Sequence, residues 1–159
     1  MTDPSVPQRV FLVVVDNTEE MHVALRYACR RARHTGGRVA LLHVIEPSDP
    51  QPFRQVAELI LAEERAQAEE LMQKMSAEVV ELSGQLPVVH LRHGDRADQL
   101  LNLIEEEPEI SVLVLAAGTG SDGPGPLISQ LVGRLSGRLR VPITVVPGAL
   151  SDDQIDLLA

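Results

Sequence analysis

The chain has 159 residues and a mass of 17.3 kDa, which is enough for one hydrophobic core and short for two. Hydrophobic residues make up 44% of it and charged residues 23%, the balance of an ordinary globular domain. The formal net charge of −9 argues against nucleic acids and anionic membranes as partners, because both are bound through clustered Lys and Arg.

The start of the chain and its cysteine content bear on the compartment. Residues 1–9 carry no apolar leader, and the aliphatic run at 10–15 is far too short to span a bilayer, so we expect a cytoplasmic protein without membrane insertion. Cys29 is the only cysteine, which excludes an intramolecular disulfide and a thiolate metal cluster. Its place in an amphipathic segment predicts a small buried side chain.

The first half of the chain alternates apolar strands with helices. Residues 9–16, RVFLVVVD, contain a continuous run of Val, Leu and Phe from 10 to 15, typical of a strand buried on both faces, and the capping and acidic residues of 17–20 begin a helix. This helix ends at two glycines, and 38–45 is a second buried strand. After a proline-rich loop, apolar residues at three- and four-residue steps predict a long helix over 53–83.

The second half continues the alternation. Its predicted elements are a strand over 87–92, a helix over 94–107 with Asp95 as N-cap, a strand over 111–117, a helix striped by leucines from 127 to 139, and a strand over 141–148. Strands separated by helices imply right-handed crossovers and an open parallel sheet covered on both faces. Ligands bind such sheets at the carboxyl ends of the strands, so the candidate loops are 16–18, 44–46 and 117–126.

The densest glycine run, GTGSDGPGPLISQLVGR at 118–134, follows the fourth strand. A Walker A loop is excluded because the run has no lysine. The dinucleotide pattern GxGxxG does match from Gly118, yet it normally follows the first strand and needs an acid after the next one, which is absent. A sparser pattern, Gly-x2-Gly-x9-Gly, is met by Gly120, Gly123 and Gly133.

With this spacing the chain resembles the universal stress protein family, as a UspA-like domain, over residues 9–148. The other matching pieces, in order, are VVVDNTEE, LLHVIEP, GDRADQLL and VPITVVP. The expected fold is a single doubly wound α/β domain over 1–148, with a five-stranded parallel sheet in strand order 3-2-1-4-5. Residues 149–159 form a tail, in which Ser151 and Gln154 have the spacing of a capping box and predict a short helix with Ile155 and Leu158 on one side.

The resemblance implies a nucleotide site for ATP or AMP, with Mg²⁺ accompanying it. Asp16 would hold the ribose or the adenine, and the backbone of Val44 would contact the adenine. Gly120, Gly123 and Gly133 would line the triphosphate path. Glycines permit close backbone approach, and a following helix offers free N–H groups to an anion.

Several residues of the glycine run depart from the family pattern. Arg134 stands where the family has a hydroxyl residue that contacts phosphate, and its guanidinium would bind phosphate in its place. Pro124 and Pro126 each lack a backbone donor, and Asp122 brings a negative charge. The sequence therefore leaves two functions open: a dimeric nucleotide-binding regulatory or sensor protein, and a protein-interaction module of the same fold without nucleotide.

Other residues have structural alternatives. Asp16 also suits a cap for the first helix, Arg134 and Arg138 also suit a solvated helix face, and His43 suits a hydrogen-bonded core histidine. We expect no metal site, because the histidines of the third strand lack partners at ligand spacing. No catalytic residue is assigned. A nucleotide-dependent enzyme lacks a basic motif here, so slow ATP hydrolysis is the most activity expected.

The resemblance also implies a homodimer in which the last strand pairs across a twofold axis. The residues of that strand are Ile143, Thr144, Val145 and Val146. An exposed sheet edge is normally paired or covered, which agrees with this expectation. The predicted C-terminal helix covers a sheet edge, covers the dimer seam, or frays; the sequence does not decide among these three.

Overall fold

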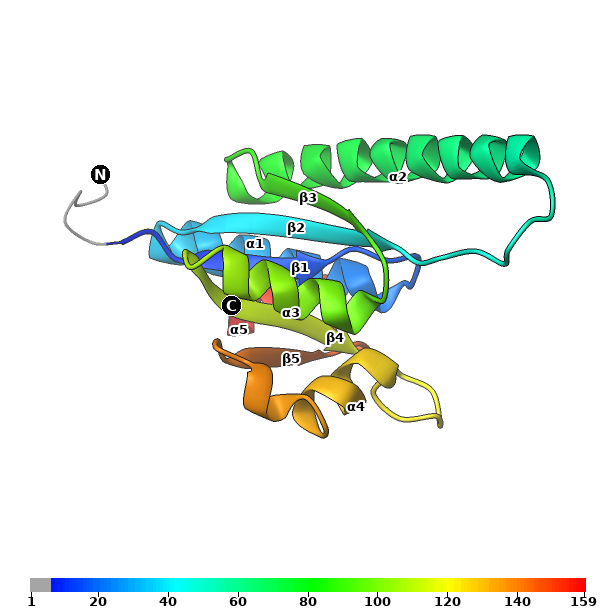
Figure 1. Cartoon of the computed structure of the whole chain (residues 1–159). Coiled ribbons are helices and arrows are strands. Elements are labelled where there is room, and N and C mark those ends of the chain that lie inside the picture. Colours follow the sequence, from blue (N-terminus) through cyan, green and yellow to red (C-terminus); the bar gives the residue numbers. More distant parts are fainter. Residues whose placement is uncertain (1–6) are drawn as a thin grey trace.

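Five parallel strands form one open sheet in the order β3-β2-β1-β4-β5, as the sequence predicts (Figure 1). The computed structural model describes residues 7–159. The strands are β1 (Val10–Val14), β2 (Arg38–Ile45), β3 (Val88–His93), β4 (Ile110–Ala117) and β5 (Ile143–Pro147). The edges of the sheet are therefore β3 and β5, and the strand order reverses between β1 and β4.

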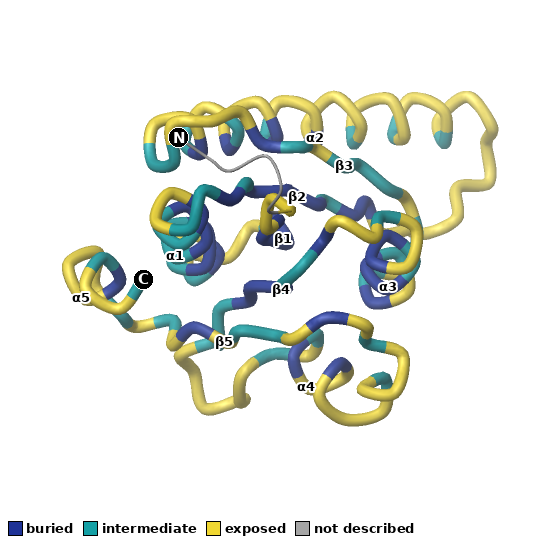
Figure 2. The backbone as a smooth tube through the Cα atoms, turned by 90° about the vertical axis from the view of Figure 1, so that its left-hand side faces the viewer, coloured by how far each residue is buried: buried dark blue, intermediate teal, exposed yellow. Residues whose placement is uncertain are grey.

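The helices lie in two layers on opposite faces of this sheet. They are α1 (Glu20–Thr35), α2 (Arg54–Ser83), α3 (Arg96–Glu106), α4 (Pro126–Val132) and α5 (Asp152–Leu158), with a short 3₁₀ turn at Ser136–Arg138. Figure 2 shows α1 and α2 over one face, with α5 beside α1, and α3 and α4 over the other. Within residues 7–159, none of the helices combines the length and apolar character that crossing a bilayer requires.

The aliphatic strands are buried because both faces of the sheet are covered. All five residues of β1 are buried, with alternate side chains such as Leu12 and Val13 entering the two core layers. Cys29 of α1 lies fully buried in the layer beneath α1 and α2, as its sequence context predicts. Burial raises the pKa of its thiol to about 12, which makes Cys29 a packing residue rather than a reactive one.

Helix α2 covers the sheet with only its second half. Its buried residues begin at Ala68, while residues 54–67 project beyond the carboxyl ends of the strands (Figure 1). This is the segment whose sequence is dominated by Glu, Arg and Gln. Gly84 ends the helix with a left-handed φ of 82°, a conformation that glycine adopts without strain.

Two helix boundaries differ from the expectation. Helix α1 begins at Glu20 with Glu19 as N-cap and no side-chain cap, so Asp16 does not cap it. Helix α4 ends at Val132, because Gly133 adopts a non-helical φ and ψ of −91° and −107°. The leucine stripe nevertheless keeps its role, since Leu131 and, after the break, Leu135 and Leu139 pack into the same core layer.

The C-terminal helix α5 forms as predicted and packs against α1. Ser151 and Gln154 make the reciprocal hydrogen bonds of a capping box. Ile155 is fully buried, whereas Leu158 is 63% exposed and does not share its side, contrary to the expectation. The Asp156 carboxylate receives two hydrogen bonds of 2.8 Å from the guanidinium of Arg26, so α5 is fastened to α1 by charge as well as by packing.

This ion pair predicts an acid-sensitive attachment of α5. The hydrogen bond from Arg26 lowers the pKa of Asp156 from 3.8 to about 2. Because the folded-state pKa is depressed, its stabilisation is present above the unfolded-state pKa and is lost as the pH falls from about 4 towards 2. Asp156→Asn should therefore lower the urea midpoint at about pH 6 and reduce its fall between about pH 4 and pH 2. The matched control is Asp153→Asn, and equal changes in both variants would contradict the prediction.

Candidate functional site

The candidate site lies at the carboxyl ends of β1 and β4, where the strand order reverses. A cavity of about 140 Å³ opens there; we call it the switch-point cavity. Its wall comes from the end of β1, the start of α1, the end of β4 and the start of α4, with one residue from α3. The lining residues are Val14, Asp16, Thr18, Glu20, Met21, Ala24, Arg96, Val114, Leu115, Ala116 and 124–128. This is the position predicted for ligands of a doubly wound sheet.

Asp16 organises the loop after β1. Its Oδ1 accepts hydrogen bonds from the backbone N–H of Thr18 at 2.9 Å and from the Thr18 hydroxyl at 2.5 Å. This arrangement is an Asx turn, in which a side chain replaces a backbone acceptor. The turn holds both residues on the wall of the switch-point cavity, with Oδ2 of Asp16 outside these two bonds.

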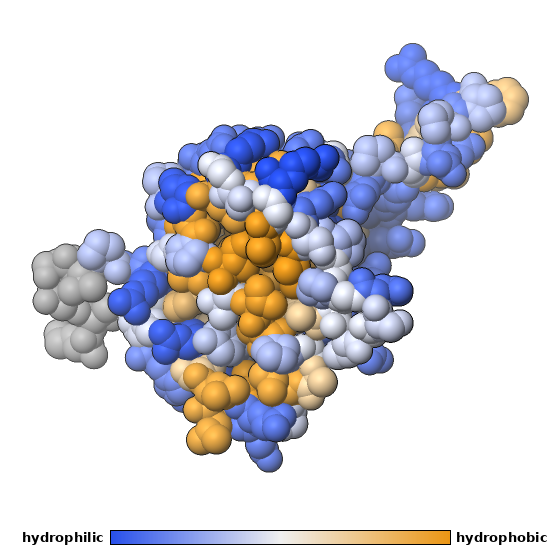
Figure 3. Space-filling model, turned by 90° about the horizontal axis from the view of Figure 1, so that it is seen from below, coloured by the Kyte–Doolittle hydropathy of each residue, from blue (hydrophilic) through white to orange (hydrophobic). Residues whose placement is uncertain are grey.

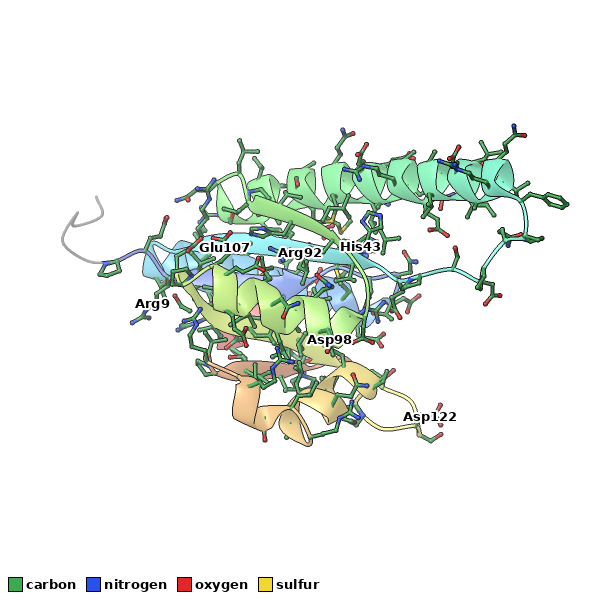
Figure 4. The ribbon with its side chains drawn as sticks, in the orientation of Figure 1. Arg9, His43, Arg92, Asp98, Glu107 and Asp122 are labelled. Atoms are coloured by element: carbon green, nitrogen blue, oxygen red, sulfur yellow. The ribbon has the colours of Figure 1, made fainter. Side chains whose placement is uncertain are left out.

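The glycine run forms a closed loop beside the cavity. The N–H of Gly118 donates to the carbonyl oxygen of Pro124 at 3.0 Å, and Gly123 and Gly125 have left-handed φ values of 87° and 114°. The chain after this closure, from Pro124 into α4, forms the cavity wall. Asp122 lies at the outer tip of the loop (Figure 4). The loop therefore turns its negative charge away from the body of the protein.

The residues expected to bind nucleotide are only partly brought together. Asp16 lines the switch-point cavity, and Val44 lines a second cavity of about 310 Å³ between α2 and the ends of β1 and β2, which we call the α2 cavity. Gly120, Gly123, Gly133 and Arg134 are exposed and belong to the wall of neither cavity. Gly133 and Arg134 follow α4, at the opposite end of this helix from Gly125, which begins it.

The sequence expectation missed two charged residues at this site. Arg96, the first residue of α3, lines both cavities, and its guanidinium lies 3.1 Å from the Glu46 carboxylate. Glu20 lines the switch-point cavity, and its carboxylate oxygen lies 3.6 Å from where a side-chain Cβ on Gly118 would stand. The sequence could have pointed to Arg96, because the segment GDRADQLL directly follows the third strand and ligands bind at strand ends.

The charges of the switch-point cavity disfavour a highly anionic ligand. Asp16 and Glu20 contribute carboxylates, and the one guanidinium in its wall, that of Arg96, is paired with Glu46. Arg138, the other candidate cation after the glycine run, pairs with Glu105 at 3.5 Å. Like charges at short range repel, so a triphosphate would need a divalent cation or a second arginine to be held here.

The described part of the chain offers no candidate metal site. Within residues 7–159, no group of three or more His, Cys, Asp or Glu side chains is arranged to hold a metal ion. His43 donates from Nδ1 to the carbonyl oxygen of Val15 at 2.7 Å, as predicted for a hydrogen-bonded histidine, but it is half-buried and lines the α2 cavity instead of lying in the core.

Comparisons with known structures agree with this architecture. The UspA protein from Lactobacillus plantarum is 20% identical with a TM-score of 0.73, covering 89% of this chain and 99% of that one. A universal stress protein described in complex with cAMP is 13% identical with a TM-score of 0.63, covering 91% and 100%. One from Archaeoglobus fulgidus in complex with dAMP is 17% identical with a TM-score of 0.59, covering 87% and 97%.

A search of the curated proteins gives no match. The family model described as the universal stress protein family matches residues 8–147. This match spans every strand of the sheet, the loop after β1 and the whole glycine run. The chain therefore belongs to the universal stress protein family.

Proposed function

We propose that this protein is a dimeric, cytoplasmic regulatory or sensor protein that binds a nucleotide at the switch-point cavity. The observation that carries the proposal is the Asx turn of Asp16, which holds a carboxylate on the wall of a cavity where the strand order reverses. Two structural neighbours are described in complex with cAMP and dAMP, which supports a nucleotide as the ligand class.

The proposed ligand is a nucleoside monophosphate such as AMP rather than ATP. The cavity of about 140 Å³ admits part of a nucleotide, and its two carboxylates oppose additional phosphate charge. In this proposal Asp16 accepts hydrogen bonds from the ribose hydroxyls, and the backbone of Val44 contacts the adenine. The phosphate path of this proposal runs along Gly120, Gly123, Gly133 and Arg134. ATP with Mg²⁺ would occupy this path once the loop that follows β4 has rearranged.

Calorimetric titration with AMP, cAMP and ATP, with and without Mg²⁺, tests the proposal. We expect saturable binding of AMP and weaker binding of ATP, with Mg²⁺ improving ATP by offsetting its charge. Absence of binding by all three at millimolar concentration would reject the proposal. It would leave the interaction module, which the closed and exposed loop 118–124 favours because it offers a surface for a protein partner.

The proposed dimer forms through the free edge of β5. Figure 3 shows the molecule from below, where β5 and α4 lie in Figure 1, and apolar side chains gather across this face. Val145 of β5 is 42% exposed and Val132 of α4 is 61% exposed. The edge of β5, from Ile143 to Val146, would continue the sheet into a second copy, which satisfies its unpaired backbone groups.

Val145→Lys is expected to convert the dimer into monomers, because pairing would bury two lysines at the seam. Val89→Lys is the matched control, since Val89 is 44% exposed and lies on β3, the other edge strand. Sedimentation velocity should give a dimer for the wild type and Val89→Lys, and a monomer of 17.3 kDa for Val145→Lys. A monomeric wild type, or a dimeric Val145→Lys, would contradict the proposed interface.

A further inference from the structure

The α2 cavity adjoins the switch-point cavity and shares Arg96 with it. It lies between α2 and the carboxyl ends of β1 and β2, and it has a volume of about 310 Å³. Val44, Ile45, Ala68 and Leu71 give it aliphatic wall, and polar side chains complete the lining. A cavity with aliphatic walls and a few polar groups is typical of a site for a small organic ligand.

One polar group in this lining is unsatisfied. The Oε2 atom of Glu64 is buried and has no hydrogen-bond partner among the described residues. Burying a carboxylate oxygen without a donor is costly, so an atom in this position calls for a donor from a water, an ion or a ligand. Glu64 stands on α2 four residues before Ala68, the first buried residue of that helix, so its carboxylate belongs to the inner side of α2 at the cavity.

A second acceptor faces the same cavity. His43 lies between the sheet and α2 (Figure 4), and its Nδ1 is committed to the carbonyl oxygen of Val15 at 2.7 Å. A carbonyl oxygen only accepts, so Nδ1 carries the hydrogen, and in this tautomer Nε2 is the acceptor of the ring. The lining also holds the amides of Asn17 and Gln67 and the guanidinium of Arg96, which lies 3.1 Å from the Glu46 carboxylate, and none of these three groups donates to Oε2 of Glu64.

We propose that the α2 cavity binds primary aliphatic amines as their ammonium ions. An ammonium group supplies three N–H donors and a positive charge, which match the Glu64 carboxylate and the lone pair of His43. The alkyl chain lies against the aliphatic wall that Ala68 and Leu71 of α2 provide. The net charge of −9 attracts cationic ligands to the protein and repels anionic ones. The amine is either a free small molecule or a lysine side chain of a partner, which present the same group.

The test is calorimetric titration of the whole protein at about 0.15 M salt, where long-range attraction to the acidic surface is screened. The probes are n-butylamine and putrescine. Two control probes each remove one property: butan-1-ol has no charge, and tetramethylammonium has no N–H donor. We expect saturable binding of the two amines only. A further titration uses Nα-acetyl-lysine amide, which represents a lysine of a partner protein. If it binds more tightly than butylamine, the natural ligand is a lysine side chain, and if it binds more weakly, the natural ligand is a free amine.

Glu64→Gln is the decisive variant, because it keeps the size and helical preference of the side chain while removing its charge. It should raise the dissociation constant of butylamine by about tenfold or more. The matched control is Glu63→Gln, an exposed neighbour on α2, which should bind as the wild type does. No saturable amine binding, equal binding of butan-1-ol, or an unchanged affinity in Glu64→Gln would overturn the inference. All titrations are made without nucleotide, so their outcomes are read independently of whether AMP binds.

Discussion

Replacing Gly148 by alanine is expected to lower the free energy of unfolding by about 1–3 kcal/mol, the usual cost of adding an atom to a closely packed site. A Cβ at this position would collide with the carbonyl oxygen of Ala117 and would approach Cβ of Glu20 at 3.1 Å and Cγ2 of Thr119 at 3.2 Å. The carbonyl belongs to the end of β4, so it moves only if that strand end moves. Because Glu20 lines the switch-point cavity, AMP binding should weaken as well.

Urea denaturation followed by circular dichroism measures this effect, and an unchanged m-value would assign the change to the folded state. Gly120→Ala is the control, since nothing lies within 4 Å of the Cβ it would add. Gly120→Ala should therefore keep the wild-type midpoint. A midpoint for Gly148→Ala equal to that of the wild type would mean that the ends of β4 and β5 separate without cost.

Replacing Asp16 by alanine is expected to raise the dissociation constant of AMP by roughly 10- to 100-fold, the value of one charge-assisted hydrogen bond. The side chain acts twice in the proposed function: it would accept from the ribose, and it holds the turn through its bonds from Thr18. Both contributions disappear in Asp16→Ala.

The variant Asp16→Asn separates the two contributions. Its amide oxygen still accepts from the N–H and hydroxyl of Thr18, so the turn persists while the charge is lost. Calorimetry should place its affinity for AMP between those of the wild type and Asp16→Ala. Wild-type affinity in both variants would show that any nucleotide binds elsewhere on the protein.

The fold is predictable from the sequence because its inner strands, β1, β2 and β4, are buried on both faces. The aliphatic run that contains β1 has no polar alternation, and each such run is followed by a segment with helical periodicity, which together specify a parallel sheet with crossovers. The caps of α3 and α5 were equally local: Asp95 accepts from the N–H of Asp98, and Ser151 from that of Gln154. In each case the pairing depends on residues three apart in the chain.

The misassigned features depend on neighbours that are distant in sequence. Nothing in the leucine stripe revealed that the helix stops at Gly133, because Leu135 and Leu139 reach the same core after the break. Asp16 has the sequence context of a helix cap, yet it bonds to Thr18 instead. A cap and an Asx turn use the same acceptor, so the sequence did not distinguish them.

The sequence by itself determined the class of this protein: a doubly wound α/β domain of the universal stress protein type, with its candidate loops after the strands at the centre of the sheet. Periodicity and glycine spacing encode these features, since both are properties of neighbouring residues along the chain. Only the tertiary structure decided which side chains meet. Arg96 at the start of α3 joins Glu46, which follows β2, and Glu64 and His43 line one cavity, because folding brings the ends of separate elements to one edge of the sheet.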